Sequence, residues 1–168
     1  MSHTSKTGRA FVFGDNIDTD VLAPGSLMKL SPEALATHCL EAVDPGFAGA
    51  VRPGDVLVAG ANFGLGSSRE QAAVSLKILG IQAVLATSFA RIFWRNAINL
   101  GLPALVFPEA REIADGDRLA LDTASGRIEN LTQNRSYEIQ TLPAHLLEMI
   151  ANGGLIPHLK HRFQGHAA

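Results

Sequence analysis

Cysteine is nearly absent from this chain. A single cysteine, Cys39, occurs among 168 residues, so the chain alone can form neither an internal disulfide nor an iron–sulfur cluster held by its own thiolates. Cys39 lies in the apolar stretch 35–40, which predicts a buried structural thiol rather than a reactive one.

The chain also lacks a strong excess of positive or negative charge, and it lacks long hydrophobic runs. The formal net charge is −2, which leaves no basic footprint for nucleic acid or for an anionic membrane surface. No apolar run is long enough to cross a bilayer, and the polar residues 1–6 lack the apolar core of a signal peptide. We therefore expect a cytoplasmic protein that binds neither nucleic acid nor a membrane.

The composition is that of an ordinary folded domain. Hydrophobic residues make up 46% of the chain and charged residues 18%, and there is no internal repeat or low-complexity linker. A length of 168 residues suits one domain. We expect a single domain over residues 1–168, with flexible tails at 1–7 and 161–168.

Strands and helices are expected to alternate through the middle of the chain. Apolar runs predict the strands and the segments between them predict helices: strands within 55–61, 81–87 and 104–107, and helices over 67–79 and 89–100. Gly80 and Gly101 follow the two helices, at the position where glycine commonly ends a helix. The alternation predicts a parallel, right-handed βαβαβ unit.

Further elements are expected on either side of this unit. Before it, the sequence predicts a strand over 9–13 and a helix that starts at Ser31-Pro32-Glu33 and runs to about Val43. After it, short runs around turns predict antiparallel strands and one more helix: strands over 118–122, 127–130 and 137–140, and a helix over 143–151. The expected fold class is therefore α/β, a parallel βαβαβ unit plus short antiparallel strands.

The stretch from Ala61 to Ala73 carries the strongest functional signal. A strand, a turn with two glycines and a helix start together predict an anion site, because unpaired N–H groups and the helix dipole meet there. Arg69 adds a planar fork that matches a carboxylate, and Ser67 and Ser68 add hydroxyls. Ser67 and Glu70 also fit a capping box, which is a purely structural interpretation. Arg69 favours a functional interpretation. A cation at the N-terminus of a helix opposes the helix dipole, and such a local conflict is more readily explained by a function.

The chemistry of this stretch is not that of a familiar nucleophile or nucleotide loop. Ser67 has no neighbouring His or Lys base, the stretch has no Gly-Lys-Ser/Thr sequence, and its two glycines are too few for a dinucleotide fingerprint. The same N–H groups, dipole and guanidinium would stabilise a serine alkoxide. Such a serine can take a proton from a carbon next to a carboxylate.

Three further groups of residues have both a structural and a functional interpretation. Asp15, Asp18 and Asp20 suit a solvated turn, and a divalent-cation loop is the alternative. Ser88 is a candidate cap for the next helix. Within that helix Arg91 and Arg95 share a face, which points either to solvent or to a partner or acid. The pair His158 and His161 suits a solvated tail, with a metal site as the alternative.

Three long motifs occur in the order of a known family. The segments Gly14–Asp20, Asn62–Ala72 and Ser88–Asn96 resemble the swivel domain of the aconitase superfamily, and look most like its isopropylmalate isomerase small subunits. The resemblance covers about residues 8–160. It implies a three-layer β/β/α swivel fold and a large partner subunit that carries a [4Fe–4S] cluster with one open iron. The single cysteine agrees with a cluster held by another chain.

The resemblance also implies roles for single residues. Ser67 matches the family's serine base, and Ser68 and Arg69 match residues that bind a substrate carboxylate. Asp20 best matches the aspartate of the first loop. The implied reaction is that of a hydro-lyase in leucine biosynthesis, in which 2-isopropylmalate loses water to give isopropylmaleate and regains it as 3-isopropylmalate. The chain is expected to bind no metal itself and to be inactive, or nearly so, without the large subunit.

The loop after the first motif selects the substrate's side group in this superfamily. Here it contains Ser26, Leu27, Met28 and Lys29, whereas citrate-type and homocitrate-type relatives carry an arginine. Leu27 and Met28 suit an isopropyl group, and Lys29 either binds a carboxylate or points to water. The alternatives are small subunits that act on 2,3-dimethylmalate, citramalate or homoaconitate, and a non-catalytic anion-binding module.

Overall fold

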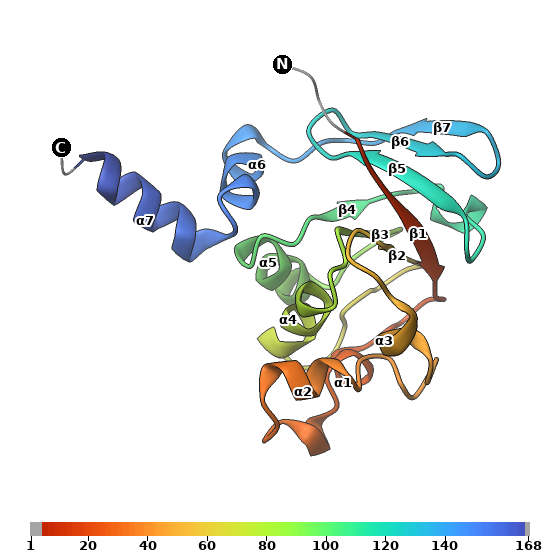
Figure 1. The fold of residues 1–168 in the computed structure, drawn as a ribbon, viewed down its shortest axis with the longest axis horizontal. Coiled ribbons are helices and arrows are strands. Elements are labelled where there is room, and N and C mark those ends of the chain that lie inside the picture. Colours follow the sequence, from red (N-terminus) through yellow and green to blue (C-terminus); the bar gives the residue numbers. More distant parts are fainter. Residues whose placement is uncertain (1–4, 167–168) are drawn as a thin grey trace.

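The computed structural model describes residues 5–166. Within them a sheet of seven strands forms the centre of the molecule, in the order β4-β3-β2-β1-β5-β6-β7 (Figure 1). Four strands are parallel to one another: β1 (Lys6–Val12), β2 (Val56–Ala59), β3 (Ala83–Ala86) and β4 (Ala104–Val106). The other three continue the sheet antiparallel: β5 (Arg118–Asp122), β6 (Arg127–Asn130) and β7 (Arg135–Glu138).

The strand β1 joins the two halves of the sheet. Its second half, Ala10–Val12, pairs parallel with β2, and its first half, Lys6–Arg9, pairs antiparallel with β5. One strand therefore serves both halves, and the antiparallel strands lie above the parallel ones in Figure 1.

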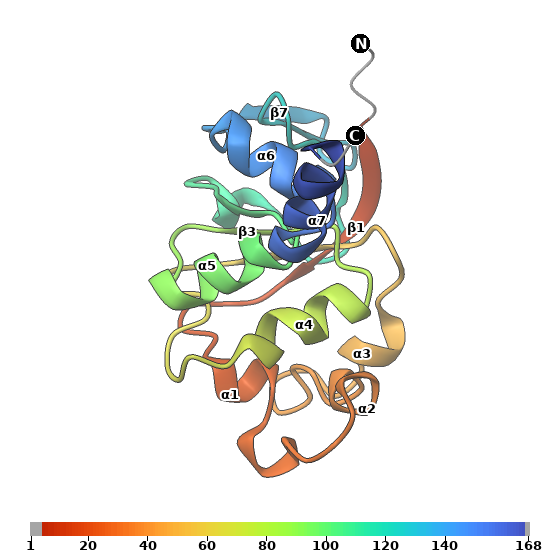
Figure 2. The same ribbon diagram turned by 90° about the vertical axis from the view of Figure 1, so that its left-hand side faces the viewer.

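Most of the helices pack on the face of the parallel strands that points away from the antiparallel strands. The face opposite β5–β7 carries α1 (Thr19–Leu22), α2 (Pro32–Ala36), α3 (Phe47–Ala50), α4 (Glu70–Ile78) and α5 (Arg91–Asn99) (Figures 1 and 2). Two helices end the described chain, α6 (Ala144–Ala151) and α7 (Leu155–His166), and α7 extends away from the body. Short 3₁₀ helices cover Gly25–Leu27 (η1) and Ala110–Glu112 (η2).

Two hydrophobic cores separate three layers. In β2, Leu57 and Ala59 face the helices, while Val56 and Val58 face the antiparallel strands. This alternation follows from the two-residue period of a strand, and it explains why the whole run is apolar. The layers are thus helices, parallel strands and antiparallel strands. The predicted α/β fold with a parallel βαβαβ unit and antiparallel strands is confirmed.

Several boundaries differ from the sequence prediction. The helix that starts at Pro32 ends at Ala36 and not near Val43. The chain turns at Leu40, which has a φ of 61° and donates its N–H to the carbonyl of Val21. A continuous helix has no residue in this conformation, so the following residues form turns. The short helix α3 was not predicted.

The ends of the chain contain regular structure. Residues 6 and 7 belong to β1 and residues 161–166 to α7, within segments that we expected as flexible tails. The rest of those predicted tails, residues 1–4 and 167–168, lies outside the described residues. No helix in the described part of the chain is long and apolar enough to span a membrane.

Candidate functional site

Three loops meet where the parallel strands end. They follow β1, β2 and β3, and their main chains are bonded to one another. The N–H of Gly64 donates to the carbonyl of Ile17 at 2.7 Å, and the N–H of Phe63 donates to the carbonyl of Ser88 at 3.1 Å. Figure 2 shows α1 and the starts of α4 and α5 on the same side of the molecule. The three sequence motifs therefore form one surface at the carboxyl edge of the sheet, the usual ligand edge in α/β folds.

Two glycines give the central loop its shape. Gly64 has a φ of 84°, and a Cβ there would lie 2.3 Å from Cβ of Phe93 in α5. Gly66 has a φ of 106°, and a Cβ there would lie 3.2 Å from Oγ1 of Thr19 in α1. Side chains rarely adopt such φ values. The loop is therefore held tightly between α1 and α5.

The serines of this loop lie outside the helix that follows. The helix α4 starts at Glu70, and its N-cap is Arg69, with φ −77°, ψ 111° and no side-chain capping bond. The predicted capping box between Ser67 and Glu70 is wrong, because the extended backbone before Glu70 leaves Ser67 before the N-cap. Ser67 and Ser68 are exposed, and neither hydroxyl bonds to another described residue. The first N–H groups of α4 are left without a side-chain cap, as an anion site requires.

Arg69 is bound to the first loop. Its Nη1 donates to Oδ1 of Asp20 at 2.8 Å and to the carbonyl of Ala23 at 3.1 Å. The same Asp20 oxygen accepts the N–H of Gly25 at 2.8 Å. The pKa of Asp20 is lowered below its usual value, mainly by the hydrogen bond from the N–H of Gly25 and next by the bond from the Arg69 guanidinium. Arg69 is thus fixed in place, while its Nε and Nη2 make no bond within the described chain.

The predicted specificity loop lies directly beside this ion pair. Residues Ser26 and Leu27 belong to η1, which follows Gly25. Leu27 and Met28 pack against the helix-side core, whereas Ser26 and Lys29 are exposed. A Cβ on Gly25 would lie 2.9 Å from Nη2 of Arg69, so η1 touches the guanidinium. A side chain at position 25 would therefore displace Arg69.

The three loop aspartates point to three different partners. Asp15 accepts the N–H of Ala61 at 2.8 Å and pairs with Arg111 at 3.2 Å. Asp18 is the N-cap of α1, and Asp20 binds Arg69. The described residues include no group of three potential metal ligands, so the three carboxylates do not gather as a cation loop would require. Sequence reasoning missed Arg111, because it lies 96 residues from Asp15 and nothing local marks it.

Two other groups singled out in the sequence are Ser88 and the pair His158 and His161. Ser88 does not cap α5, because the N-cap of that helix is Ala90. Instead, the hydroxyl of Ser88 accepts the N–H of Asn62 at 2.8 Å and so connects two loops. His158 bonds to Asn152 at 2.9 Å, and His161 is exposed.

Cys39 does not suit a metal cofactor. It is fully buried, and burial raises the pKa of its thiol. A [4Fe–4S] cluster requires several thiolates, and this chain supplies one buried thiol. The chain's own residues therefore do not fit such a cluster.

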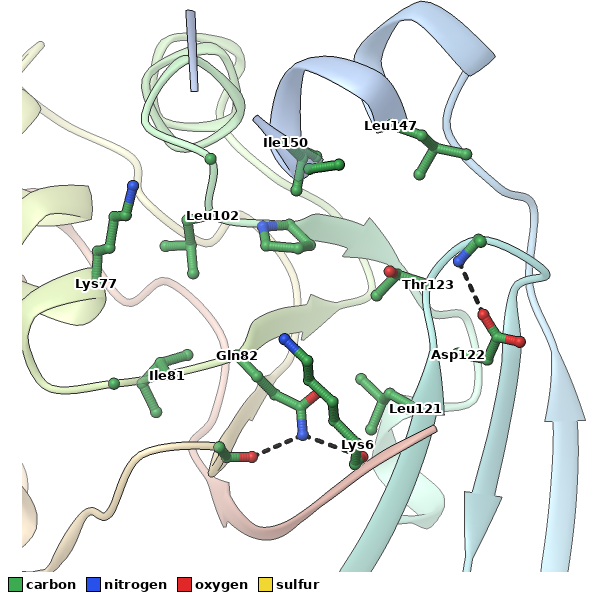
Figure 3. Close-up of a pocket in the computed structure, with 16 residues that line it drawn as sticks. Lys6, Lys77, Ile81, Gln82, Leu102, Leu121, Asp122, Thr123, Leu147 and Ile150 are labelled. Atoms are coloured by element: carbon green, nitrogen blue, oxygen red, sulfur yellow. Dashed lines mark hydrogen bonds between the residues drawn. The ribbon is translucent and has the colours of Figure 1, made fainter. Parts of the chain in front are cut away.

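A cavity lies at the opposite edge of the sheet. It has a volume of about 640 Å³, and Leu102, Leu121 and Ile150 form part of its wall (Figure 3). The amide of Gln82 donates to the carbonyls of Gly54 and Lys6, at 2.6 and 3.2 Å. Lys77 donates to the carbonyls of Leu100 and Gly153. These polar groups hold turns and strand starts together and converge on no common point.

Comparisons with known proteins give a consistent result. A family model described as the aconitase C-terminal domain matches residues 41–110. The 3-isopropylmalate dehydratase small subunits of Nautilia profundicola and Moorella thermoacetica are each 48% identical, over 92% and 90% of this chain and 93% of each relative. The methanogen homoaconitase small subunit of Methanothermobacter thermautotrophicus is 47% identical, over 90% of this chain and 88% of that protein.

A solved structure supports the same assignment. The crystal structure of 3-isopropylmalate dehydratase from Methanocaldococcus jannaschii superposes with a TM-score of 0.92 at 43% identity. The superposition covers 97% of this chain and 98% of that one. Sequence and fold similarity therefore extend over nearly the whole chain, including the three loops.

Proposed function

The chain belongs to the family of 3-isopropylmalate dehydratase small subunits in the aconitase superfamily, and we propose that it isomerises 2-isopropylmalate and 3-isopropylmalate together with a large subunit. A family member of this kind is part of a hydro-lyase. The observation that carries the proposal is the group formed by the exposed Ser67 and Ser68 and the partly buried Arg69 at an uncapped helix start. Leucine biosynthesis in the cytoplasm is the proposed setting.

Ser67 is proposed as the base. Its alkoxide takes the proton from the carbon next to a carboxylate, and the electron pair of the broken C–H bond forms the C=C bond of isopropylmaleate. The hydroxyl on the neighbouring carbon leaves as hydroxide. What supports this role is that the Ser67 hydroxyl is exposed and that Ser67 lies just before Arg69 and the uncapped start of α4, a cation and a helix end that favour a negative charge. In rehydration, hydroxide adds to the carbon that lost the proton, and the Ser67 hydroxyl gives its proton to the carbon that lost the hydroxyl.

Arg69 is proposed to hold a substrate carboxylate, with Ser68 as a second donor. Asp20 and Ala23 bind only Nη1 of the guanidinium. The free Nε and Nη2 offer the two parallel donors that a carboxylate binds. Asp20 then acts as a positioning residue that fixes the direction of this fork.

The rest of the active site is proposed to lie on the large subunit. The described residues include no group of side chains that could hold a metal ion, and the single cysteine of the chain is buried and does not fit a cluster. A [4Fe–4S] cluster bound by the large subunit would act as a Lewis acid. The proposed substrate is a small 2-hydroxy dicarboxylic acid.

One similar protein is a homoaconitase small subunit, so the substrate has to be argued separately from the family. A homoaconitase small subunit is 47% identical to this chain, a value close to those of the isopropylmalate enzymes. The specificity loop favours isopropylmalate, because Leu27 and Met28 are half-buried and apolar and the loop contains no arginine. Lys29 is exposed and is proposed to point to water.

A substrate panel tests this proposal. The chain is combined with its large subunit, and turnover is measured for 2-isopropylmalate, citramalate, 2,3-dimethylmalate and homoaconitate. We expect the highest kcat/KM for 2-isopropylmalate, and no loss of that value in Lys29→Ala. Preferred turnover of homoaconitate that disappears in Lys29→Ala would show that Lys29 binds a carboxylate and would overturn the substrate assignment.

A further inference from the structure

One side of α5 presents charged and apolar side chains that are exposed in the described part of the chain. Its inner side buries Phe93, Ala97 and Ile98, and its outer side exposes Arg91, Ile92 and Arg95. The exposed fraction of Ile92 is 51%, and Val106 of the neighbouring edge strand β4 is 49% exposed. We call Arg91, Ile92, Arg95 and Val106 the α5 face.

The two arginines are placed for an external acid. Neither forms an ion pair or a side-chain hydrogen bond with another described residue. They are one helical turn apart, an arrangement in which like charges repel. Arg91 is also the first residue of the helix, where a cation is unfavourable next to the dipole. A carboxylate from another molecule would relieve both conflicts.

A hollow adjoins these arginines. It has a volume of about 430 Å³ and is lined by Thr87, Ser88, Phe89, Arg91, Trp94 and Val106. The hydroxyl of Thr87 is buried without a hydrogen-bond partner in the described chain. Trp94 donates from Nε1 to the carbonyl of Ala104 at 3.0 Å, which fixes the wall of the hollow. The hollow therefore offers apolar walls, one unused hydroxyl and an arginine at its rim.

The α5 face is continuous with the candidate active site. Ser88, which lines the hollow, accepts the N–H of Asn62 through its hydroxyl and the N–H of Phe63 through its carbonyl. Ala90, the N-cap of α5, donates to the carbonyl of Phe63 at 2.9 Å. The loop that carries Ser67 is thus joined to the start of α5. A chain that covers Ser67 must approach this surface.

We infer that the α5 face is where the large subunit docks. The inference rests on the proposed function, which requires a second chain over the same edge. The docking segment would carry acidic side chains opposite Arg91 and Arg95 and an apolar side chain that enters the hollow. This partner chemistry complements the exposed charge and the exposed Ile92 and Val106.

Charge reversal in the complex tests the inference. The dissociation constant between chain and large subunit is measured for the wild type, for Arg91→Glu/Arg95→Glu and for Ile92→Asp. We expect about a hundred-fold weaker binding or more for the double variant, because each reversal places like charges in contact. Thermal unfolding of each variant alone shows whether it is folded. The matched control is Arg118→Glu/Arg162→Glu, since both arginines are exposed and unpaired in the described chain; it should bind within about three-fold of the wild type.

The outcomes separate the docking inference from the function. Wild-type affinity for both Arg91→Glu/Arg95→Glu and Ile92→Asp overturns the docking inference and leaves the function intact. Normal affinity with reduced turnover at saturating large subunit also overturns it, because the arginines would then act on substrate. A wild-type complex that forms but turns over no substrate overturns the function alone. Failure of the wild type to bind the large subunit overturns both.

Discussion

The two edges of the parallel sheet differ in how their polar groups are used. At the amino edge, beside the cavity of about 640 Å³, Gln82 and Lys77 are bonded to main-chain carbonyls. At the carboxyl edge, the hydroxyls of Ser67 and Ser68 and two nitrogens of Arg69 remain available. The edge with the cavity of about 640 Å³ thus has its polar groups occupied, whereas the carboxyl edge has donors left for a ligand. For this reason the proposed site lies at the carboxyl edge.

The largest expected effect concerns Ser67. In the reconstituted complex, Ser67→Ala should lower kcat about 10²–10⁴-fold, as the loss of a general base does. Thr123→Ala at the amino edge removes a similar hydroxyl and should leave kcat within about two-fold. Steady-state kinetics on both complexes provides the comparison. Equal losses of kcat in the two variants would show that the carboxyl edge has no special role in turnover.

The conformation of the loop that carries Ser67 depends on one glycine. Gly64→Ala places a methyl group against Phe93 at a φ of 84°, so we expect a loss of about 2–4 kcal/mol in the free energy of unfolding. Denaturant unfolding of the isolated chain measures this loss. Gly116→Ala is the control, because Gly116 has a similar φ but no atom within 4 Å of its added Cβ. An equal loss in both variants would show that φ alone, and not the contact with α5, is responsible.

Arg69 tests whether fork geometry matters at the carboxyl edge. Arg69→Lys keeps the positive charge but loses the two parallel donors, so KM should rise about 10–100-fold with a smaller change in kcat. Kinetics in the complex measures both constants. An unchanged KM would show that no carboxylate binds to Arg69.

Asp117 provides a structural carboxylate to compare with Asp20. Burial alone would raise its pKa, but hydrogen bonds from Asn130, the N–H of Ala114 and Gln133 outweigh this, and the pKa is lowered. Because the pKa is lower in the folded state, the ionised carboxylate stabilises the fold at pH values above its pKa in the unfolded chain, about 3.9. This stability is lost as the pH falls below that value toward the folded-state pKa. Asp117→Asn should therefore cost about 1–2 kcal/mol at pH 7 and weaken the acid dependence of unfolding. Denaturant unfolding between pH 2 and 7 checks this, with kcat of the complex expected to be unchanged.

The smallest effect is expected at the amino edge. Lys77→Met removes two bonds to main-chain carbonyls from an exposed side chain and should cost about 1 kcal/mol of stability. Turnover by the complex should not change. A loss of turnover without a loss of stability would show that the large cavity takes part in function.

How far the sequence predicts this molecule depends on how local each signal is. The apolar runs predict β2, β3 and β4, because strands buried on both faces need apolar residues throughout. The start of α4 was misplaced, because the loop before it is held by a bond from the N–H of Thr19 to the carbonyl of Leu65 at 2.9 Å, which joins distant segments. The pair of Asp15 and Arg111 was also missed, since it joins distant segments.

The candidate site follows mainly from the motif resemblance. Glycines, serines and Arg69 in one stretch predict an anion site, but only the three ordered motifs connect that stretch with a hydro-lyase. The bond between Arg69 and Asp20 was not predicted as such, although both residues were singled out as site residues. The fold supplies this link by placing the loops after β1 and β2 at the same edge.

A competition assay tests the central claim, that this chain carries one half of an active site. The large subunit is held limiting with wild-type chain and 2-isopropylmalate, and Ser67→Ala chain is added in excess. The account predicts that turnover falls in proportion to the variant's share of the chain, because the variant binds the large subunit but cannot remove the proton. Turnover that stays constant as the folded variant is added in excess would contradict it.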